Sequence, residues 1–118
     1  MIATHQPVHC VEVDGRRIET DSEGYLVDRE QWSEAFAREL ARQEGLELTP
    51  AHWEVIRFLR NEYQENGHSP NFRNMLKGFQ ALRPDADSKF LYDLFPVGPA
   101  KQGAKVAGLP QPYGKGGY

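Results

Sequence analysis

The single cysteine of the sequence, Cys10, is the side chain best suited to covalent chemistry. Its only basic neighbour in the sequence is His9, and the two residues are adjacent on an expected strand, so their side chains point to opposite faces and cannot easily share a metal ion. The other histidines, His5, His52 and His68, make no ligand pair at the spacing of known zinc sites. We therefore predict no metal and no cofactor. Cys10 stays a candidate thiol, although an inert strand cysteine is the more common interpretation.

A second set of candidate residues lies in the segment 49–82, which reads as two helices joined by a tight turn. Such a pair resembles a helix-turn-helix, and its second helix would present residue types that contact DNA: Asn71, Arg73, Asn74 and Lys77. The alternative is an ordinary helical hairpin. The first helix also carries glutamates that would repel phosphate. DNA binding is therefore the lesser hypothesis.

Composition limits the classes of protein to which the chain can belong. The 118 residues suit one domain, residues 1–118, and with 39% hydrophobic and 26% charged residues a core can form without disulfides. The formal charge is −6 over residues 1–97 and +3 over residues 98–118, so an acidic body precedes a basic end. No apolar run is long enough to span a membrane, and the first residues lack the features of a signal peptide. We expect a cytoplasmic monomer with no membrane contact.

The elements that must position these candidates begin with a β-hairpin over residues 8–20, after a flexible start at residues 1–7. Asp14-Gly15 lies between two alternating runs, which is a strong two-residue turn signal. This turn would place Val11 opposite Ile18 on an apolar face that must pack on another element.

Helical spacing of apolar residues predicts about five helices over the body, residues 28–107. Asp28 opens a capping-box pattern for the first helix. Thr49 and Ser69, each followed by proline, would cap the next two. Pro99 would open the last. The fold class is therefore α+β and mostly helical, with the hairpin packed on a helical body that includes the helix-turn-helix-like pair.

The last residues, 108–118, carry prolines and glycines that a helix or a central strand does not tolerate. We predict a mobile C-terminal arm there. An arm of this kind is either functional or simply disordered.

Several segments resemble the DsrC/TusE family of sulfur-relay proteins, in one register over nearly the whole chain. The strongest are K-F-L-Y-D-L-F-P-V-G-P-A-K-Q and A-G-L-P-Q-P-Y-G near the C-terminus. The others lie upstream: V-D-G (13–15), E-G-Y-L (23–26), L-T-P-A-H-W-E-V-I-R-F-L-R (48–60) and S-P (69–70). The resemblance implies a mostly helical fold with an N-terminal hairpin and a mobile arm.

The resemblance also implies where the chemistry of the family would sit. In such proteins the cysteine near the end of the arm carries sulfur, and part of the family has an earlier cysteine on the last helix. The resemblance places the terminal position at Lys115 and the earlier one at Ala104, so this chain is identified as a member that lacks both arm cysteines. The residues that would dock the arm on a partner are Lys101, Gly108, Leu109, Pro110, Pro112, Tyr113 and Lys115.

Two main hypotheses for function follow from the resemblance. The favoured one is a partner-binding or regulatory homologue in sulfur metabolism that is not itself catalytic, because a lysine amine cannot replace a thiol in persulfide exchange. The alternative is a sulfur carrier or sulfurtransferase component that works through Cys10 or another route. For both hypotheses the expected partners are proteins of a sulfur relay, resembling DsrEFH, TusBCD or sulfite reductase. The DNA-binding regulator is the third and lesser hypothesis.

Overall fold

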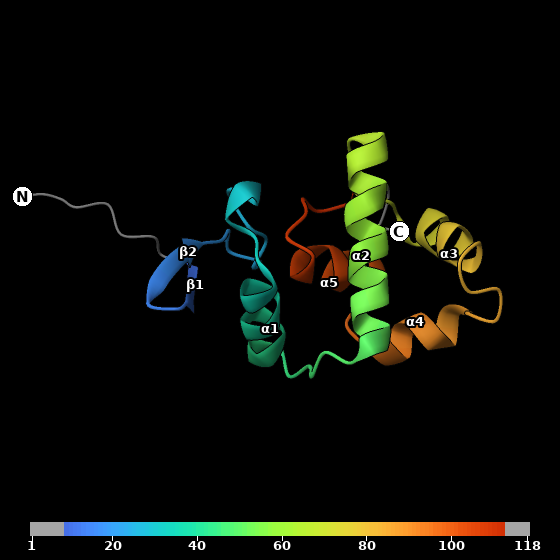
Figure 1. Ribbon diagram of the computed structural model, residues 1–118, viewed down its shortest axis with the longest axis horizontal. Coiled ribbons are helices and arrows are strands. Elements are labelled where there is room, and N and C mark those ends of the chain that lie inside the picture. The colour runs from blue at the N-terminus through green and yellow to red at the C-terminus, as the bar shows by residue number, and fades with distance from the viewer. Residues whose placement is uncertain (1–8, 113–118) are drawn as a thin grey trace, which may run out of the picture.

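The computed structural model describes residues 9–112 and shows a small two-stranded sheet followed by helices (Figure 1). The strands are β1 (Cys10–Val13) and β2 (Arg16–Glu19). After a 3₁₀ turn (Arg29–Gln31) come the helices α1 (Glu34–Gln43), α2 (Pro50–Asn66), α3 (Phe72–Gln80), α4 (Ser88–Leu94) and α5 (Pro99–Val106). The predicted fold class is confirmed.

The hairpin forms at the predicted turn. Asp14 and Gly15 both have positive φ, at 52° and 81°, which is the geometry of the tight turn favoured between twisted antiparallel strands. Val11 pairs with Ile18, and both side chains are buried. Their apolar face packs on α1, which lies next to the hairpin in the ribbon view (Figure 1).

The first helix begins later than the sequence pattern predicts. Asp28 caps only the short 3₁₀ turn, by accepting a hydrogen bond from the backbone N–H of Glu30. The chain then becomes extended at Trp32, and Ser33 caps α1 by accepting from the backbone N–H of Phe36. Trp32 is therefore outside the helix, because a second N-cap restarts it two residues later.

The next two helices show one confirmed cap and one correction. Thr49 caps α2 together with His52, and Gly67 ends it with φ 78°. Ser69 does not cap α3. Its hydroxyl donates instead to the carbonyl of Pro110 at 2.6 Å, and Asn71 accepts from the backbone N–H of Asn74 as the N-cap. The Ser69 hydroxyl that the local pattern assigns to a helix cap is therefore used in a tertiary hydrogen bond to Pro110.

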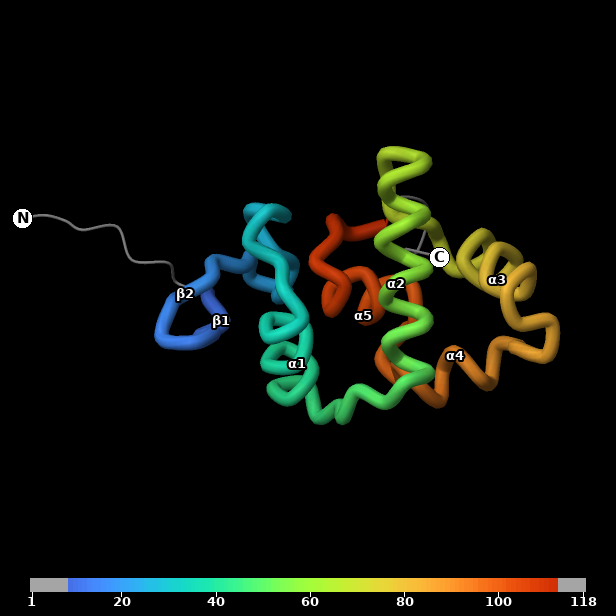
Figure 2. The backbone as a smooth tube through the Cα atoms, in the orientation of Figure 1, coloured from blue at the N-terminus to red at the C-terminus, as the bar shows by residue number. Residues whose placement is uncertain are grey.

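The last helix, α5, is the centre of the body and contacts α1, α2, α3 and α4. The tube view shows it behind α2 and between the two halves of the molecule (Figure 2). Small residues allow this close packing, because a Cβ at Gly103 would lie 2.9 Å from Leu59 Cδ1. The surrounding core contains large buried side chains from the other helices, including Phe36, Ile56, Leu59, Met75, Phe79, Leu91 and Phe95. The hairpin side and the helical side therefore share one core.

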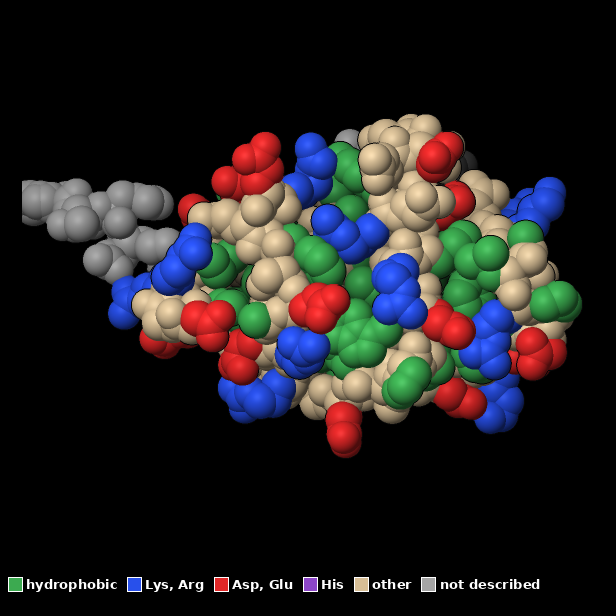
Figure 3. Space-filling model, in the orientation of Figure 1, with side chains coloured by type: hydrophobic (Ala, Val, Ile, Leu, Met, Phe, Trp, Pro, Cys, Tyr) green, Lys and Arg blue, Asp and Glu red, His purple; other side chains and the backbone are tan. Residues whose placement is uncertain are grey.

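Within residues 9–112 no helix is both long and apolar enough to cross a membrane. The space-filling view shows acidic and basic side chains interspersed over one face, with basic side chains along the boundary between α1 and α2 (Figure 3). That boundary leads to the site described next.

Candidate functional site at the root of the C-terminal segment

The chain after α5 is held against the helical body by three side chains. Trp32 Nε1 donates to the carbonyl of Val106 at 3.0 Å, and Arg60 Nη1 donates to that of Ala107 at 2.7 Å. The hydroxyl of Ser69 donates to the carbonyl of Pro110. These bonds come from the segment before α1, from α2 and from the turn before α3. They fix the course of residues 106–110, a stretch that we call the root.

Gly108 is the residue that lets the root turn. Its φ is +74°, a conformation that L side chains rarely adopt, and a Cβ at this position would lie 2.7 Å from Trp32 Cγ. The Trp32 indole therefore packs directly on the backbone at this point. Only glycine satisfies both the turn and the contact.

The root differs from the predicted arm, which began at residue 108. Leu109 is 3% exposed, its backbone N–H donates to the carbonyl of Ala104 at 2.9 Å, and Pro112 is also buried. Leu109 therefore anchors the chain to its own body and is not free to anchor a partner. Tyr113 and Lys115 lie outside the described residues.

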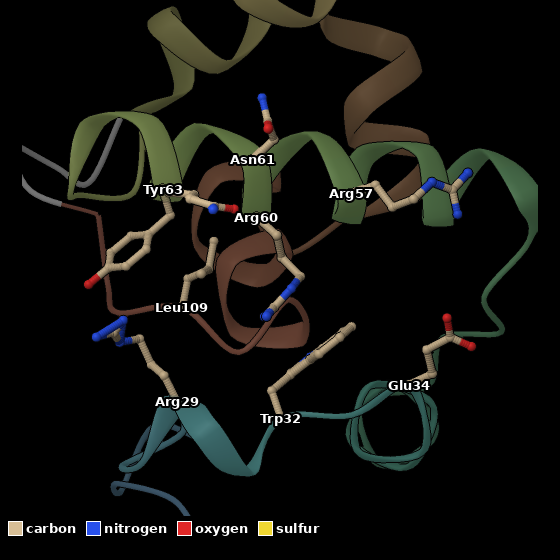
Figure 4. A pocket seen from close by; sticks show the side chains of 9 residues that line it. Arg29, Trp32, Glu34, Arg57, Arg60, Asn61, Tyr63 and Leu109 are labelled. Atoms are coloured by element: carbon tan, nitrogen blue, oxygen red, sulfur yellow. The ribbon is translucent and has the colours of Figure 1, made fainter.

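A cleft of about 540 Å³ opens beside the root, between the segment before α1 and the exposed side of α2 (Figure 4). Leu109 lines it from the C-terminal segment. Three arginines also line it: Arg29, Arg57 and Arg60. No sequence pattern indicates this cluster, because these arginines come from two elements that are far apart along the chain.

Two of these guanidinium groups stack on aromatic rings. Arg60 lies 3.9 Å from the centroid of the Trp32 ring, and Arg29 lies 4.8 Å from that of Tyr63. Burial lowers the pKa of Arg60 from its usual value, and the nearby positive charge of Arg29 lowers it further. Stacking holds a guanidinium plane in one orientation. Nη1 of Arg60 already donates to the carbonyl of Ala107, so this arginine offers its remaining N–H groups to a ligand.

The cleft arginines form no ion pair among the described residues. The one carboxylate that lines the cleft, Glu34, pairs with Arg38 at 3.2 Å. The cleft is therefore a positive site within a chain whose formal net charge is −3. Arrangements of this kind attract anions, most strongly those that can accept two hydrogen bonds from one guanidinium.

The predicted arm lysines have different surroundings. Lys101 is exposed, while its backbone carbonyl accepts from the hydroxyl of Tyr25 at 3.4 Å. Lys105 forms a half-buried ion pair with Glu44 at 2.9 Å, and Gln102 also donates to Glu44. The charge of Lys105 is therefore used inside the fold.

Cys10 is half-buried at the start of β1, far along the chain from the root. It lines a hollow of about 400 Å³ together with Asp21, Glu23 and Glu44, and no lysine or arginine lines this hollow. Ala104, the position matched to a family cysteine, is fully buried in α5.

No group of metal-ligating side chains exists in the described part of the chain. His52 in particular has a structural role. Its Nε2 lies 2.7 Å from the carbonyl of Leu94, which can only accept, so Nε2 carries the proton. Nδ1 then accepts from the backbone N–H of Thr49 at 3.0 Å.

The residues predicted to face DNA lie together on α3. Arg73, Asn74 and Lys77 are exposed, whereas Asn71 is used as the N-cap of the helix. The two helices form the predicted pair, but exposed Glu65 lies near the end of α2. DNA binding stays a prediction.

Comparisons with known proteins place the chain in one family. Residues 12–115 match the family described as DsrC like protein. The protein is 52% identical over 104 residues to "Sulfurtransferase TusE" of Pectobacterium atrosepticum, a match that covers 86% of this chain and 95% of that one. Its fold is similar to the NMR structure of Allochromatium vinosum DsrC, with a TM-score of 0.82 and 43% identity over 89% of this chain and 96% of that one. It is also similar to the oxidized gamma-subunit of the dissimilatory sulfite reductase (DsrC) from Archaeoglobus fulgidus, with a TM-score of 0.79 and 38% identity over 90% of this chain and 98% of that one. The chain belongs to the DsrC-like family of sulfur-relay proteins.

Proposed function

We propose that this protein is a component of a sulfur relay and acts as a sulfur carrier in contact with protein partners. The observation that carries the proposal is the match to relatives named sulfurtransferases, at about half identity over most of both chains. This name favours the carrier hypothesis over the regulatory one.

The carrier step would use Cys10, since it is the single cysteine of the sequence. The Cys10 thiolate attacks the outer sulfur of a donor persulfide. The S–S bond of the donor breaks, a new S–S bond forms on Cys10, and the donor leaves as a thiolate. No further oxidant or reductant is needed for this exchange.

Incubation with glutathione persulfide, followed by intact-mass and peptide analysis, tests the step. We expect a gain of about 32 Da, one sulfur atom, on the peptide that contains Cys10. The variant Cys10→Ser should not gain it. A gain that persists in Cys10→Ser, or no gain in the native chain, would contradict the carrier proposal.

A second candidate function is partner binding without sulfur transfer. Its specific support is that no lysine or arginine lines the hollow beside Cys10, so no such side chain there lowers the pKa of a thiol. Lys115 and Ala104 at the matched positions support it as well. Under this candidate, the protein should compete with a cysteine-bearing homologue for a relay partner while staying unloaded.

A further inference from the structure

We propose that the arginine cleft beside the root binds a carboxylate-bearing segment of a protein partner. The inference rests on the proposed function only in that a partner protein exists. It adds a binding site, formed by Arg29, Arg57 and Arg60, and a class of ligand, an acidic peptide.

Charge is the first support. Glu34, the carboxylate that lines the cleft, is paired with Arg38, and Lys105 is paired with Glu44. The three cleft arginines have no such partner within residues 9–112. Burial is the larger cause of the lowered pKa of Arg60, and the positive charge of Arg29 lowers it further. An anion from outside would offset the repulsion between these two arginines.

Geometry is the second support. Tyr63 covers one face of the Arg29 guanidinium, and Trp32 covers one face of the Arg60 guanidinium. Both guanidinium planes are therefore held in place before a ligand arrives. A carboxylate accepts two parallel hydrogen bonds from such an edge. In the close-up view, Arg29 and Arg60 project into the hollow from opposite walls, and Arg57 extends from α2 toward the end that Glu34 occupies (Figure 4). The hollow of about 540 Å³ has the size of a peptide side-chain or small-ligand site.

The surroundings favour a short acidic segment over a nucleic acid. Glu34 lines the cleft, and exposed Glu30 and Glu54 lie near it on the 3₁₀ turn and on α2. A nucleic acid would bring a row of phosphates across these glutamates, whereas one or two carboxylates can enter the cleft and avoid them. Nucleic-acid binding normally needs a continuous basic surface.

The position links the cleft to the root. Arg60 holds the carbonyl of Ala107 and also lines the cleft, and Leu109 lines it from the other side. A partner that approaches the C-terminal segment therefore passes over the cleft. An acidic segment of that partner would add electrostatic attraction and fix the orientation of docking.

The test is a titration of the full chain with an N-acetylated peptide of alternating aspartate and glutamate, at low salt. Binding is followed by ¹⁵N–¹H NMR, with the Trp32 indole N–H as reporter of the cleft. The variants Arg29→Gln and Arg57→Gln each remove one cleft charge, and both residues are exposed, so the fold should persist. The matched control is Arg73→Gln, which removes the same charge from the exposed surface of α3.

We expect the native chain and Arg73→Gln to bind with dissociation constants within about twofold of each other, because Arg73 is remote from the cleft. Each cleft variant should weaken binding about fivefold or more. The same peptide with asparagine and glutamine should not shift the Trp32 signal. Thermal unfolding of each variant checks that folding is intact.

Three results would overturn the inference: equal binding by all variants, equal binding of the neutral peptide, or tighter binding of a single-stranded oligonucleotide than of the acidic peptide. The peptide titration does not involve sulfur. If the native chain gains sulfur on Cys10 but does not bind the acidic peptide, only the cleft proposal is rejected. If it binds the peptide but gains no sulfur, only the carrier proposal is rejected.

Discussion

The hollow beside Cys10 and the cleft beside the root have linings of opposite charge, although α1 borders both of them. The hollow beside Cys10 meets the C-terminal end of α1 and is lined by Asp21, Glu23 and Glu44. The cleft beside the root meets its N-terminal end and is lined by three arginines. The single thiol therefore lies at the acidic end of the molecule, while anions are attracted to the other end. Partner binding and thiol chemistry can therefore use different surfaces of this chain.

The same two regions differ in how tightly the chain is packed at its turns. Gly15 in the hairpin and Gly108 in the root both have positive φ, at 81° and 74°. Nothing lies within 4 Å of a Cβ built at Gly15, whereas Gly108 is covered by Trp32. The hairpin turn is local and open, and the root turn is a tertiary contact. We therefore expect substitutions at the root to destabilise the protein more than substitutions at the hairpin turn.

Gly108→Ala should destabilise the protein strongly, by about 3 kcal/mol or more, because it adds left-handed strain and displaces the Trp32 ring. Gly15→Ala should cost only about 1 kcal/mol, because the strain is present without the collision. Urea unfolding of both variants measures the difference. Equal losses would show that Trp32 does not hold the root as described.

Tyr25 should titrate well above the ordinary pKa of a tyrosine, which is 10.0. Burial, followed by the charges of Glu23, Asp21 and Glu44, raises its pKa to about 12. The neutral phenol is favoured in the folded state, so this contribution to stability is complete below the ordinary pKa near 10 and is lost as pH rises through about 12. Tyrosinate absorbance of the native chain and of Tyr25→Phe isolates the titration. An early titration by Tyr25 would contradict its burial.

The ion pair between Lys105 and Glu44 links α5 to the end of α1, and we expect it to contribute a measurable coupling free energy to folding. Their side chains are 16% and 22% exposed, and a double-mutant cycle with Lys105→Met and Glu44→Gln should give a coupling of about 1 to 2 kcal/mol. The exposed pair Lys89 and Asp93 is the control and should show no resolvable coupling. Similar couplings for the two pairs would remove the distinction.

Ser69→Ala should cost about 1 kcal/mol, because it removes the hydrogen bond to the carbonyl of Pro110. The control Ser88→Ala changes an exposed first residue of α4 and should stay within about 0.5 kcal/mol of the native chain. Denaturant unfolding measures both, and faster hydrogen exchange at Leu109 in Ser69→Ala would locate the effect. Unchanged stability and exchange would mean that the root is held without Ser69.

The smallest effect is expected for duplex DNA. The exposed face of α3 offers only Arg73 and Lys77 as cations, so we expect no gel shift near physiological salt. Arg73→Ala should therefore change nothing. A tight, sequence-selective complex that Arg73→Ala disrupts would support the helix-turn-helix hypothesis instead.

Turns and helix starts could be predicted from the sequence, because the residues that specify each of them lie close together along the chain. Asp14-Gly15 specified the hairpin register, Thr49-Pro50 the start of α2 and Pro99 the start of α5. These predictions hold because turns and caps satisfy neighbouring backbone groups, so the energy that decides them is local. The family resemblance was also readable from contiguous segments.

Which side chains are used in contacts within the fold, and which remain available to a ligand, depends on the tertiary structure. Ser69 and Asp28 fit cap patterns by sequence, yet Ser69 binds the root and Asp28 caps only a short turn. Lys105 reads as a free cation and is paired with Glu44. The arginine cleft had no sequence signal, because residues 29, 57 and 60 meet only after α5 and the root have brought the segment before α1 against α2. Contacts between residues far apart in sequence depend on the packing of the whole core, which local patterns do not encode.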